Sequence, residues 1–201
     1  MTRLLVIGSS GQLGVELLRA ALPAGWTINA PARDLLDLTH ASALAAFVAA
    51  QRPDIIINAS GYTAVDKAES EPDLAFALNR DGPGALAKAA AAAGAALVHV
   101  STDYVFAGNG DRAYVETDPK APLGVYGRSK SEGEDAVLAA GARAAIVRTS
   151  WVFSPHRANF VKTMLRLGES REEVGIVADQ HGRPTSARDL ATTCITLAQH
   201  L

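Results

Sequence analysis

The sequence predicts an α/β fold in which helices cover both faces of one doubly wound, parallel sheet. Three observations indicate this fold. Short, continuously apolar runs alternate with longer segments of helical spacing along most of the chain. The apolar runs lack polar–apolar alternation, as expected for strands that are buried on both faces. A glycine-rich turn joins the first apolar run to the first helical segment, which is typical of the opening βα unit of such sheets.

The expected elements alternate from the N-terminus onward, with strands at the short apolar runs and helices between them. In chain order they are a strand at 4–7, a helix at 12–21, a weaker strand at 27–30, a helix at 41–51, a strand at 54–58, helices at 73–79 and 84–93, a strand at 96–100, a helix at 126–140 and a strand at 144–148. Parallel strands joined in this way need right-handed crossovers.

Single residues set several of these boundaries. Thr39 is the expected N-cap of the helix at 41–51, and Pro53 ends that helix. The run Asp81-Gly82-Pro83 predicts a break or kink before the next helix. Residues 107–122 are rich in Gly, Asp and Pro, so they predict a long loop.

The pattern loosens after Trp151, where we expect a helix at 159–167, an extended segment at 174–178 and a helix at 186–201. We therefore expect two parts. Residues 1–151 form the sheet domain, and residues 152–201 form a small appended part.

Composition excludes several classes of protein. The formal net charge of the 201 residues is −2, which argues against binding to nucleic acid. The single cysteine, Cys194, excludes an internal disulfide and a multi-cysteine zinc site. No apolar run reaches the roughly 18 residues of a membrane span, and the first run is too short for a signal peptide. We therefore expect a cytoplasmic protein that does not bind membranes.

The glycine-rich turn has the spacing G-x-x-G-x-x-G at residues 8–14. In this position Gly8 permits a tight turn, Gly11 lets the backbone approach a pyrophosphate, and Gly14 lets helix and strand pack closely. Free N–H groups and the positive end of the helix dipole then face the phosphates. The pattern predicts a Rossmann-like, dinucleotide-binding domain, and the alternative is a merely flexible turn between strand and helix.

The choice of nicotinamide cofactor depends on the residues after the second strand. An acid there would hold ribose hydroxyls, whereas an arginine would suit a 2′-phosphate. The chain offers Arg33, Asp34 and Asp37. We expect NADPH through Arg33, with NADH as the alternative if Arg33 is only a solvated surface cation.

Tyr126 and Lys130 are four residues apart on an expected helix, so they share one face. A free tyrosine has a pKa near 10, and a neighbouring ammonium lowers that pKa. The pair can therefore carry a proton between a carbonyl and an alcohol. Thr102 follows the strand at 96–100, at the sheet edge where ligands bind, and its hydroxyl can reach the same oxygen. The alternative is an ordinary surface pair on a helix.

These motifs carry a resemblance that runs from Gly8 to about Ala191. The chain resembles the extended short-chain dehydrogenase/reductases and, among them, the dTDP-4-dehydrorhamnose reductase family. The resemblance rests on the segments 8–14, 58–69, 101–106, 126–130, 148–151 and 179–185. Thr-Ala-Val-Asp-Lys-Ala-Glu at 63–69 and Arg-Thr-Ser-Trp at 148–151 are its most specific parts.

The resemblance implies reduction of the 4-keto group of dTDP-4-dehydro-L-rhamnose to dTDP-L-rhamnose by NADPH or NADH. Tyr126 would donate the proton, Lys130 would hold the nicotinamide ribose and lower the tyrosine pKa, and Thr102 would orient them. With the glycine turn and Arg33 included, the expected cofactor contacts are Gly8, Ser10, Gly11, Gln12, Leu13, Arg33, Asp37, Leu38, Ala59, Ser60, Gly61, Tyr62, Thr63, Tyr126 and Lys130. The expected substrate contacts are Val65, Thr102, Asp103 and Trp151, and Trp151 has the alternative of a core aromatic.

The resemblance also implies a possible homodimer with Mg²⁺ at a contact between subunits, where Glu16 would take part. Glu16 as a surface carboxylate is the alternative, and no metal ligands are assigned in the chain. The family's chains continue beyond the position of Leu201, so we expect an incomplete substrate part and low turnover. We expect His99, in an apolar strand, to be a hydrogen-bonded core residue.

Two other functions stay open. The regulatory subunit of methionine adenosyltransferase resembles the same family, so a cofactor-binding regulatory or scaffold protein is one alternative. The second alternative is another keto-sugar nucleotide reductase or epimerase of the extended family. A dehydratase is disfavoured because Tyr104 stands beside Asp103, where that reaction needs an acid.

Overall fold

The computed structural model describes residues 1–110 and 112–201 and confirms the α/β fold. Residue 111, inside the loop expected at 107–122, lies outside the described residues. Within them, five parallel strands form one sheet in the order β2-β1-β3-β4-β5. The strands are β1 (Thr2–Ile7), β2 (Trp26–Asn29), β3 (Ile55–Asn58), β4 (Ala96–Thr102) and β5 (Ala144–Thr149).

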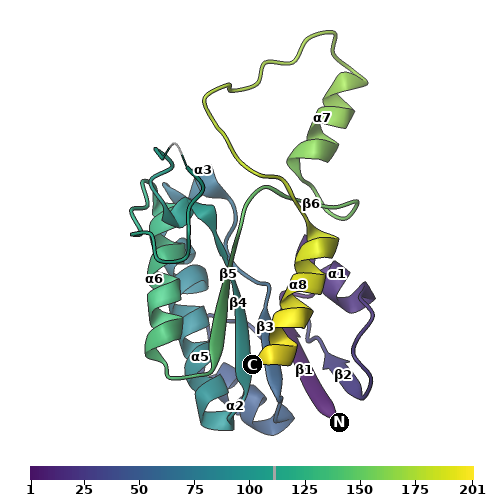
Figure 1. Ribbon diagram of the computed structural model, residues 1–201, viewed down its shortest axis with the longest axis vertical. Coiled ribbons are helices and arrows are strands. Elements are labelled where there is room, and N and C mark those ends of the chain that lie inside the picture. The colour runs from purple at the N-terminus through teal and green to yellow at the C-terminus, as the bar shows by residue number, and fades with distance from the viewer. Residues whose placement is uncertain (111) are drawn as a thin grey trace.

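Helices form a layer on each face of this sheet (Figure 1). One layer holds α1 (Gln12–Arg19) and α8 (Ala187–His200), and the other holds α2 (Ala41–Gln51), α5 (Gly82–Ala93) and α6 (Val125–Ala139). Alternate side chains of the strands enter the two cores: Leu4 and Val6 pack with α1 and α8, whereas Leu5 and Ile7 pack with α2 and α5. Burial on both faces explains why the strands are apolar throughout.

Of the break or kink expected at residues 81–83, the break is wrong. α4 (Pro72–Phe76) continues through a π-helical turn, η1 (Ala77–Asp81), directly into α5. Gly82 has helical backbone angles, and Pro83 lies in the first turn of α5, where its missing N–H is tolerated. The chain therefore passes Pro83 without leaving the helical conformation.

The expected cap of α2 is also wrong. The residue that precedes α2 is His40, which makes no side-chain capping bond. Thr39 lies one position too early, and its hydroxyl donates instead to Asp37 Oδ1 at 2.8 Å. Short helices that were not predicted occur at α3 (Val65–Ala68) and η2 (Asp103–Val105).

The residues after β5 lie in two places, one away from the main sheet and one packed on it (Figure 1). β6 (Val152–Phe153) and β7 (Thr185–Ser186) pair in parallel, and α7 (Phe160–Gly168) projects away from the main sheet (Figure 1). The extended segment expected at 174–178 forms no strand in the described structure. α8 returns to the main sheet, where Leu190 and Cys194 are buried in the core with β1 and β3. The packing therefore does not follow the boundary expected at Trp151.

Among the described residues, none of the helices combines the length and the apolar character that crossing a bilayer requires.

Candidate active site

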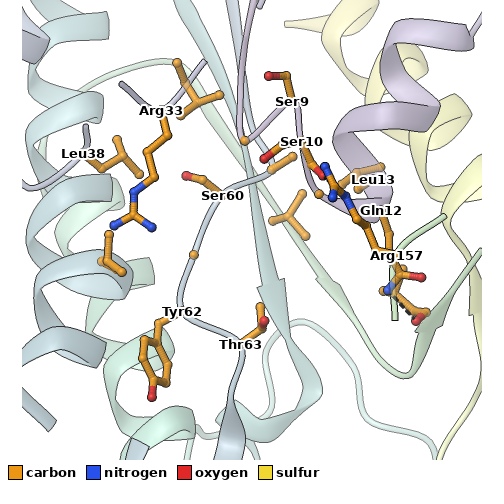
Figure 2. Close-up of a pocket in the computed structure, with 18 of the residues that line it drawn as sticks. Ser9, Ser10, Gln12, Leu13, Arg33, Leu38, Ser60, Tyr62, Thr63 and Arg157 are labelled. Atoms are coloured by element: carbon orange, nitrogen blue, oxygen red, sulfur yellow. Dashed lines mark hydrogen bonds between the residues drawn. The ribbon is translucent and has the colours of Figure 1, made fainter. Parts of the chain in front are cut away.

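A cavity of about 470 Å³ opens at the carboxyl ends of β1, β3 and β4, within the range of about 300–1,000 Å³ that is usual for small-molecule sites. Arg33 and Leu38 lie on one side of this cavity, and Ser10, Gln12 and Arg157 lie on the other (Figure 2). The structure brings together all the residues expected to contact a cofactor, because each of them lines this cavity. Their individual roles stay predictions.

The glycine turn between β1 and α1 has the shape of an anion cradle. Gly8 has a φ of +85°, and a Cβ on Gly14 would lie 2.1 Å from the Gly8 carbonyl oxygen, so both positions require glycine. A Cβ on Gly11 would meet only the Gly8 oxygen at 3.5 Å, an ordinary contact. Gly11 precedes α1 and leaves the first turn without a side-chain cap. The N–H groups of this helix end therefore have no side-chain acceptor, and Gly11, Gln12 and Leu13 line the cavity.

Tyr126 and Lys130 lie on α6, which packs closely on the backbone that follows β4. A Cβ on Gly127 would lie 2.3 Å from the Tyr104 carbonyl oxygen, and the rings of Tyr104 and Tyr126 meet edge-to-face at 5.5 Å. Lys130 is 5% exposed, and its Nζ donates to the Val100 carbonyl oxygen at 2.7 Å. The close packing of α6 holds both side chains at the end of β4.

The expected lowering of the tyrosine pKa by Lys130 is wrong for this structure. Burial raises the pKa of Tyr126 to about 12, and the hydroxyl of Thr102 is the group that opposes this rise. Lys130 is turned toward Val100, and burial lowers its own pKa to about 8. Tyr126 is therefore protonated at neutral pH, which is the form that a proton donor needs.

Thr102 ends β4 and organises the turn after it. Its Oγ1 donates to Asp103 Oδ1 at 3.1 Å and accepts from the Tyr104 N–H at 3.2 Å. Burial raises the pKa of the Asp103 carboxyl. Thr102 and Asp103 lie beside the cavity next to Tyr126 but outside its lining.

Arg33 and Asp37 lie at the mouth of the cavity. Arg33 Nε is 3.7 Å from Asp37 Oδ2, and the Arg33 side chain is 74% exposed. Asp37 Oδ1 accepts from both the N–H and the hydroxyl of Thr39, and the backbone bond is the main cause of its lowered pKa. The carboxylate is thus held mainly by Thr39, whereas the exposed guanidinium makes only the longer contact with Asp37.

Two buried asparagines that were not predicted hold the segment 59–63 in place. Asn58 Oδ1 accepts from the Ser60 N–H at 3.1 Å. Asn79, in η1, pairs with both backbone groups of Tyr62 and donates to Ser129 Oγ at 3.0 Å. Asn79 therefore links the cavity wall to the helix of Tyr126. An amide inside an otherwise apolar strand or helix was the available signal for both residues.

His99 is buried as expected, but it is not fully hydrogen-bonded. Its Nδ1 lies 3.1 Å from Asn58 Nδ2, and its Nε2 has no partner among the described residues. Burial holds the pKa of the imidazole well below its usual value, so the ring is neutral.

The residues expected to bind substrate lie outside the cavity lining. Trp151 is 43% exposed with a φ of +46°, so the alternative of a core aromatic is wrong. Its ring packs on Gly182, where a Cβ would lie 2.6 Å away. Val65 begins α3. Glu69, one residue beyond α3, accepts from the Val125 N–H at 2.7 Å and so caps α6.

Mg²⁺ at a contact between subunits, with Glu16 taking part, stays a prediction. Glu16 Oε1 lies 3.2 Å from His156 Nε2, in a separate pocket that Arg19 and Arg188 also line. Within residues 1–110 and 112–201, no group of three or more His, Cys, Asp or Glu side chains could hold a metal ion.

The residues that line the cavity do fit a dinucleotide. Gly8 and Gly14 let β1, α1 and the segment at 59–60 pack closely around the turn, and Gly11, whose Cβ would meet only the Gly8 oxygen at 3.5 Å, lines the cavity. Thr149 also lines the cavity, and its buried Oγ1 has no partner within the described part of the chain. An unpartnered hydroxyl and free helix N–H groups are what a polar ligand would satisfy.

Comparison with known proteins extends this picture. Residues 1–201 match a family model described as the RmlD substrate binding domain. The chain is 48% identical over 199 residues to a dTDP-4-dehydrorhamnose reductase of Sinorhizobium fredii, covering 99% of this chain and 67% of that protein. It is also 48% identical over 191 residues to the Escherichia coli protein of the same name, covering 94% of this chain and 64% of that protein.

Solved structures show the same similarity. The crystal structure of dTDP-4-dehydrorhamnose reductase from Bacillus anthracis in complex with NADP matches with a TM-score of 0.95 at 42% identity. The match covers 99% of this chain and 71% of that chain. The 201 residues thus span about two thirds of the length of the curated relatives they match.

Proposed function

Because this chain belongs to the dTDP-4-dehydrorhamnose reductase family, we propose that it reduces the 4-keto group of dTDP-4-dehydro-L-rhamnose with a nicotinamide cofactor. The product would be dTDP-L-rhamnose. The observation that carries the proposal is the placement of Tyr126, Lys130 and Thr102 together at the end of β4, beside a cavity with an anion cradle. An unpaired surface tyrosine and lysine would show no such placement.

Tyr126, Thr102 and Lys130 each have a separate role in a carbonyl reduction. A bound reduced nicotinamide supplies a hydride to the carbonyl carbon. Tyr126 is protonated because its pKa is about 12, and it donates its phenolic proton to the carbonyl oxygen as negative charge develops there. Thr102 lies close enough to affect the Tyr126 pKa, so its hydroxyl orients the same oxygen. The Lys130 ammonium holds ribose hydroxyls at the inner end of the cavity.

The other end of the cavity holds the phosphates and the adenosine. The N–H groups at the start of α1 meet the pyrophosphate, as helix N-termini do with anions. Arg33 faces the 2′-phosphate, which makes NADPH the preferred cofactor. The homodimer and the cytoplasmic location remain predictions, and neither enters this scheme.

Two measurements on the 201-residue chain test the proposal. We expect NADPH to raise the melting temperature, because a ligand at a hundredfold excess over its Kd stabilises the folded state by about 2.7 kcal/mol. We also expect loss of reduced-nicotinamide absorbance that depends on dTDP-4-dehydro-L-rhamnose. If the reduced nicotinamide is oxidised only with a different keto-sugar nucleotide, the proposed substrate is wrong. Absence of any effect of both NADPH and NADH on the melting temperature would overturn the whole proposal.

The variant Arg33→Ala tests the choice of cofactor. Arg33 is largely exposed, so the loss of its contact with the 2′-phosphate should weaken NADPH about tenfold, the lower end for a charge-assisted hydrogen bond. NADH lacks this phosphate and should bind as before, which makes it the internal control. Calorimetric titration of both cofactors measures the difference. Equal losses for NADPH and NADH would show that Arg33 does not discriminate.

The pH profile of the reduction tests the role of Lys130. Burial lowers the pKa of Lys130 to about 8, so the ammonium is present below this pH and is lost as the pH rises through it. We expect kcat/KM, which reports the free enzyme, to fall above a pH of about 8. In Lys130→Arg the guanidinium stays charged, so the fall should move to higher pH. A profile that stays level through this range would contradict the role.

A further inference from the structure

The segment 152–159, outside the five-stranded sheet, is fastened to the glycine turn by several hydrogen bonds. Gln12, the first residue of α1, donates from Nε2 to the Val152 carbonyl oxygen at 3.2 Å. Its Oε1 accepts from Ser154 Oγ and from Asn159 Nδ2, both at 2.9 Å. Because Gln12 lines the cavity, this segment is held directly beside the site expected to bind phosphates.

Arg157 is the cationic residue of this segment, and its backbone is unusual. It has a φ of +58°, in the left-handed region that non-glycine residues seldom adopt. Its Nε donates to the Ser10 carbonyl oxygen at 2.7 Å, and the residue lines the cavity. Its side chain runs along the glycine turn beside Ser10 and Gln12 (Figure 2). The strained backbone and the Nε bond together hold the guanidinium against the turn.

The cationic side chains that line the cavity lie at different places around it. Among the described residues that line the cavity, the cations are Arg33, Lys130 and Arg157. Arg33 lies across the cavity beside Asp37, and Lys130 is bound to Val100. Of these three, only Arg157 lies beside the glycine turn that leads into α1 (Figure 2). Within the described structure its Nη groups make no hydrogen bond, so four N–H donors are available there.

We propose that Arg157 binds the pyrophosphate of the dinucleotide, as a side-chain cation supplied from outside the five-stranded sheet. This inference rests on the proposed binding of a nicotinamide dinucleotide. A guanidinium forms short, charge-assisted hydrogen bonds with phosphate oxygens, and it complements the N–H groups of the helix end. Cofactor binding is then coupled to the position of the segment 152–159.

Calorimetric titration of the variant Arg157→Asn tests this inference. Asparagine tolerates the left-handed region, so the substitution removes the charge and keeps the backbone. We expect the affinity for NADPH and for NADH to fall by the same factor, about tenfold, because both contain the pyrophosphate. We also expect a weaker dependence of affinity on salt than in the wild type, since one screened attraction is gone.

Lys162→Gln is the matched control. Lys162 is a cation anchored on the same segment, where its Nζ donates to the Pro155 carbonyl oxygen at 2.8 Å, and it does not line the cavity. We expect it to leave both affinities and their salt dependence unchanged. Equal losses in the two variants would show that only the anchoring of the segment matters.

The remaining outcomes separate this inference from the proposed function. If the wild type binds NADPH, and Arg157→Asn binds NADPH and NADH with the same affinities as the wild type, Arg157 does not touch the pyrophosphate. A loss confined to NADPH would place the guanidinium at the 2′-phosphate and overturn the assignment. If the wild type binds neither cofactor, the proposed function itself fails.

Discussion

Replacement of Tyr126 by phenylalanine is expected to lower kcat for the keto-sugar reduction by about 10²–10⁴-fold, the usual contribution of general acid catalysis. The phenolic proton is the one that Tyr126 would donate, and its pKa of about 12 keeps it in place at neutral pH. The ring itself remains, so its edge-to-face contact with Tyr104 at 5.5 Å is kept. Steady-state kinetics with saturating NADPH measures the effect, and calorimetry should find the NADPH affinity nearly unchanged.

Tyr104→Phe is the matched control for this prediction. Tyr104 lies against Tyr126 on the turn after β4, is more exposed and does not line the cavity. Its loss of a hydroxyl should change kcat little. Near-normal turnover in Tyr126→Phe, or an equal loss in both variants, would refute Tyr126 as the proton donor.

Replacement of Arg148 by methionine should lower the free energy of unfolding by about 3 kcal/mol, because it leaves a buried carboxylate without its main partner. Glu134, on α6, is 1% exposed. Arg148, on β5, meets it twice, with Nη2–Oε2 at 2.7 Å and Nε–Oε1 at 2.9 Å. Ser101 donates to the same carboxylate at 2.6 Å, so the cluster joins α6 to β4 and β5. Urea unfolding followed by circular dichroism measures the loss.

The double variant Arg148→Met with Glu134→Met is the control. Removal of both partners leaves no buried carboxylate without its guanidinium, so the double variant should unfold at a higher urea concentration than Arg148→Met alone. The prediction would be contradicted if the single variant were as stable as the wild type. A double variant no more stable than the single one would show that lost packing, for example of Arg148 on the Phe106 ring at 4.9 Å, dominates.

Sequence patterns predicted the sheet well because burial on both faces leaves a strong local signal. All five strands of the main sheet were expected, within two residues at each end. The glycine turn was predicted equally well, since Gly8 has a positive φ and Gly14 is in close contact with the backbone of Gly8 and Ser9. The break before α5 was predicted wrongly because a π-helical turn carries the helix past Pro83. This turn packs closely on α6, where a Cβ on Gly133 would lie 1.9 Å from the Asn79 carbonyl oxygen.

The candidate site, too, was predicted in part from local sequence patterns and decided in part by tertiary packing. The sequence by itself determined which residue types could bind a dinucleotide and move a proton, because the glycine spacing and the Tyr126–Lys130 spacing are local properties of one turn and one helix. Only the tertiary structure decided their surroundings. Burial sets the pKa values of Tyr126 and Lys130, and Arg157 reaches Ser10 across 147 positions of sequence. Desolvation and long-range contacts depend on which distant segments pack together, and no local pattern encodes them.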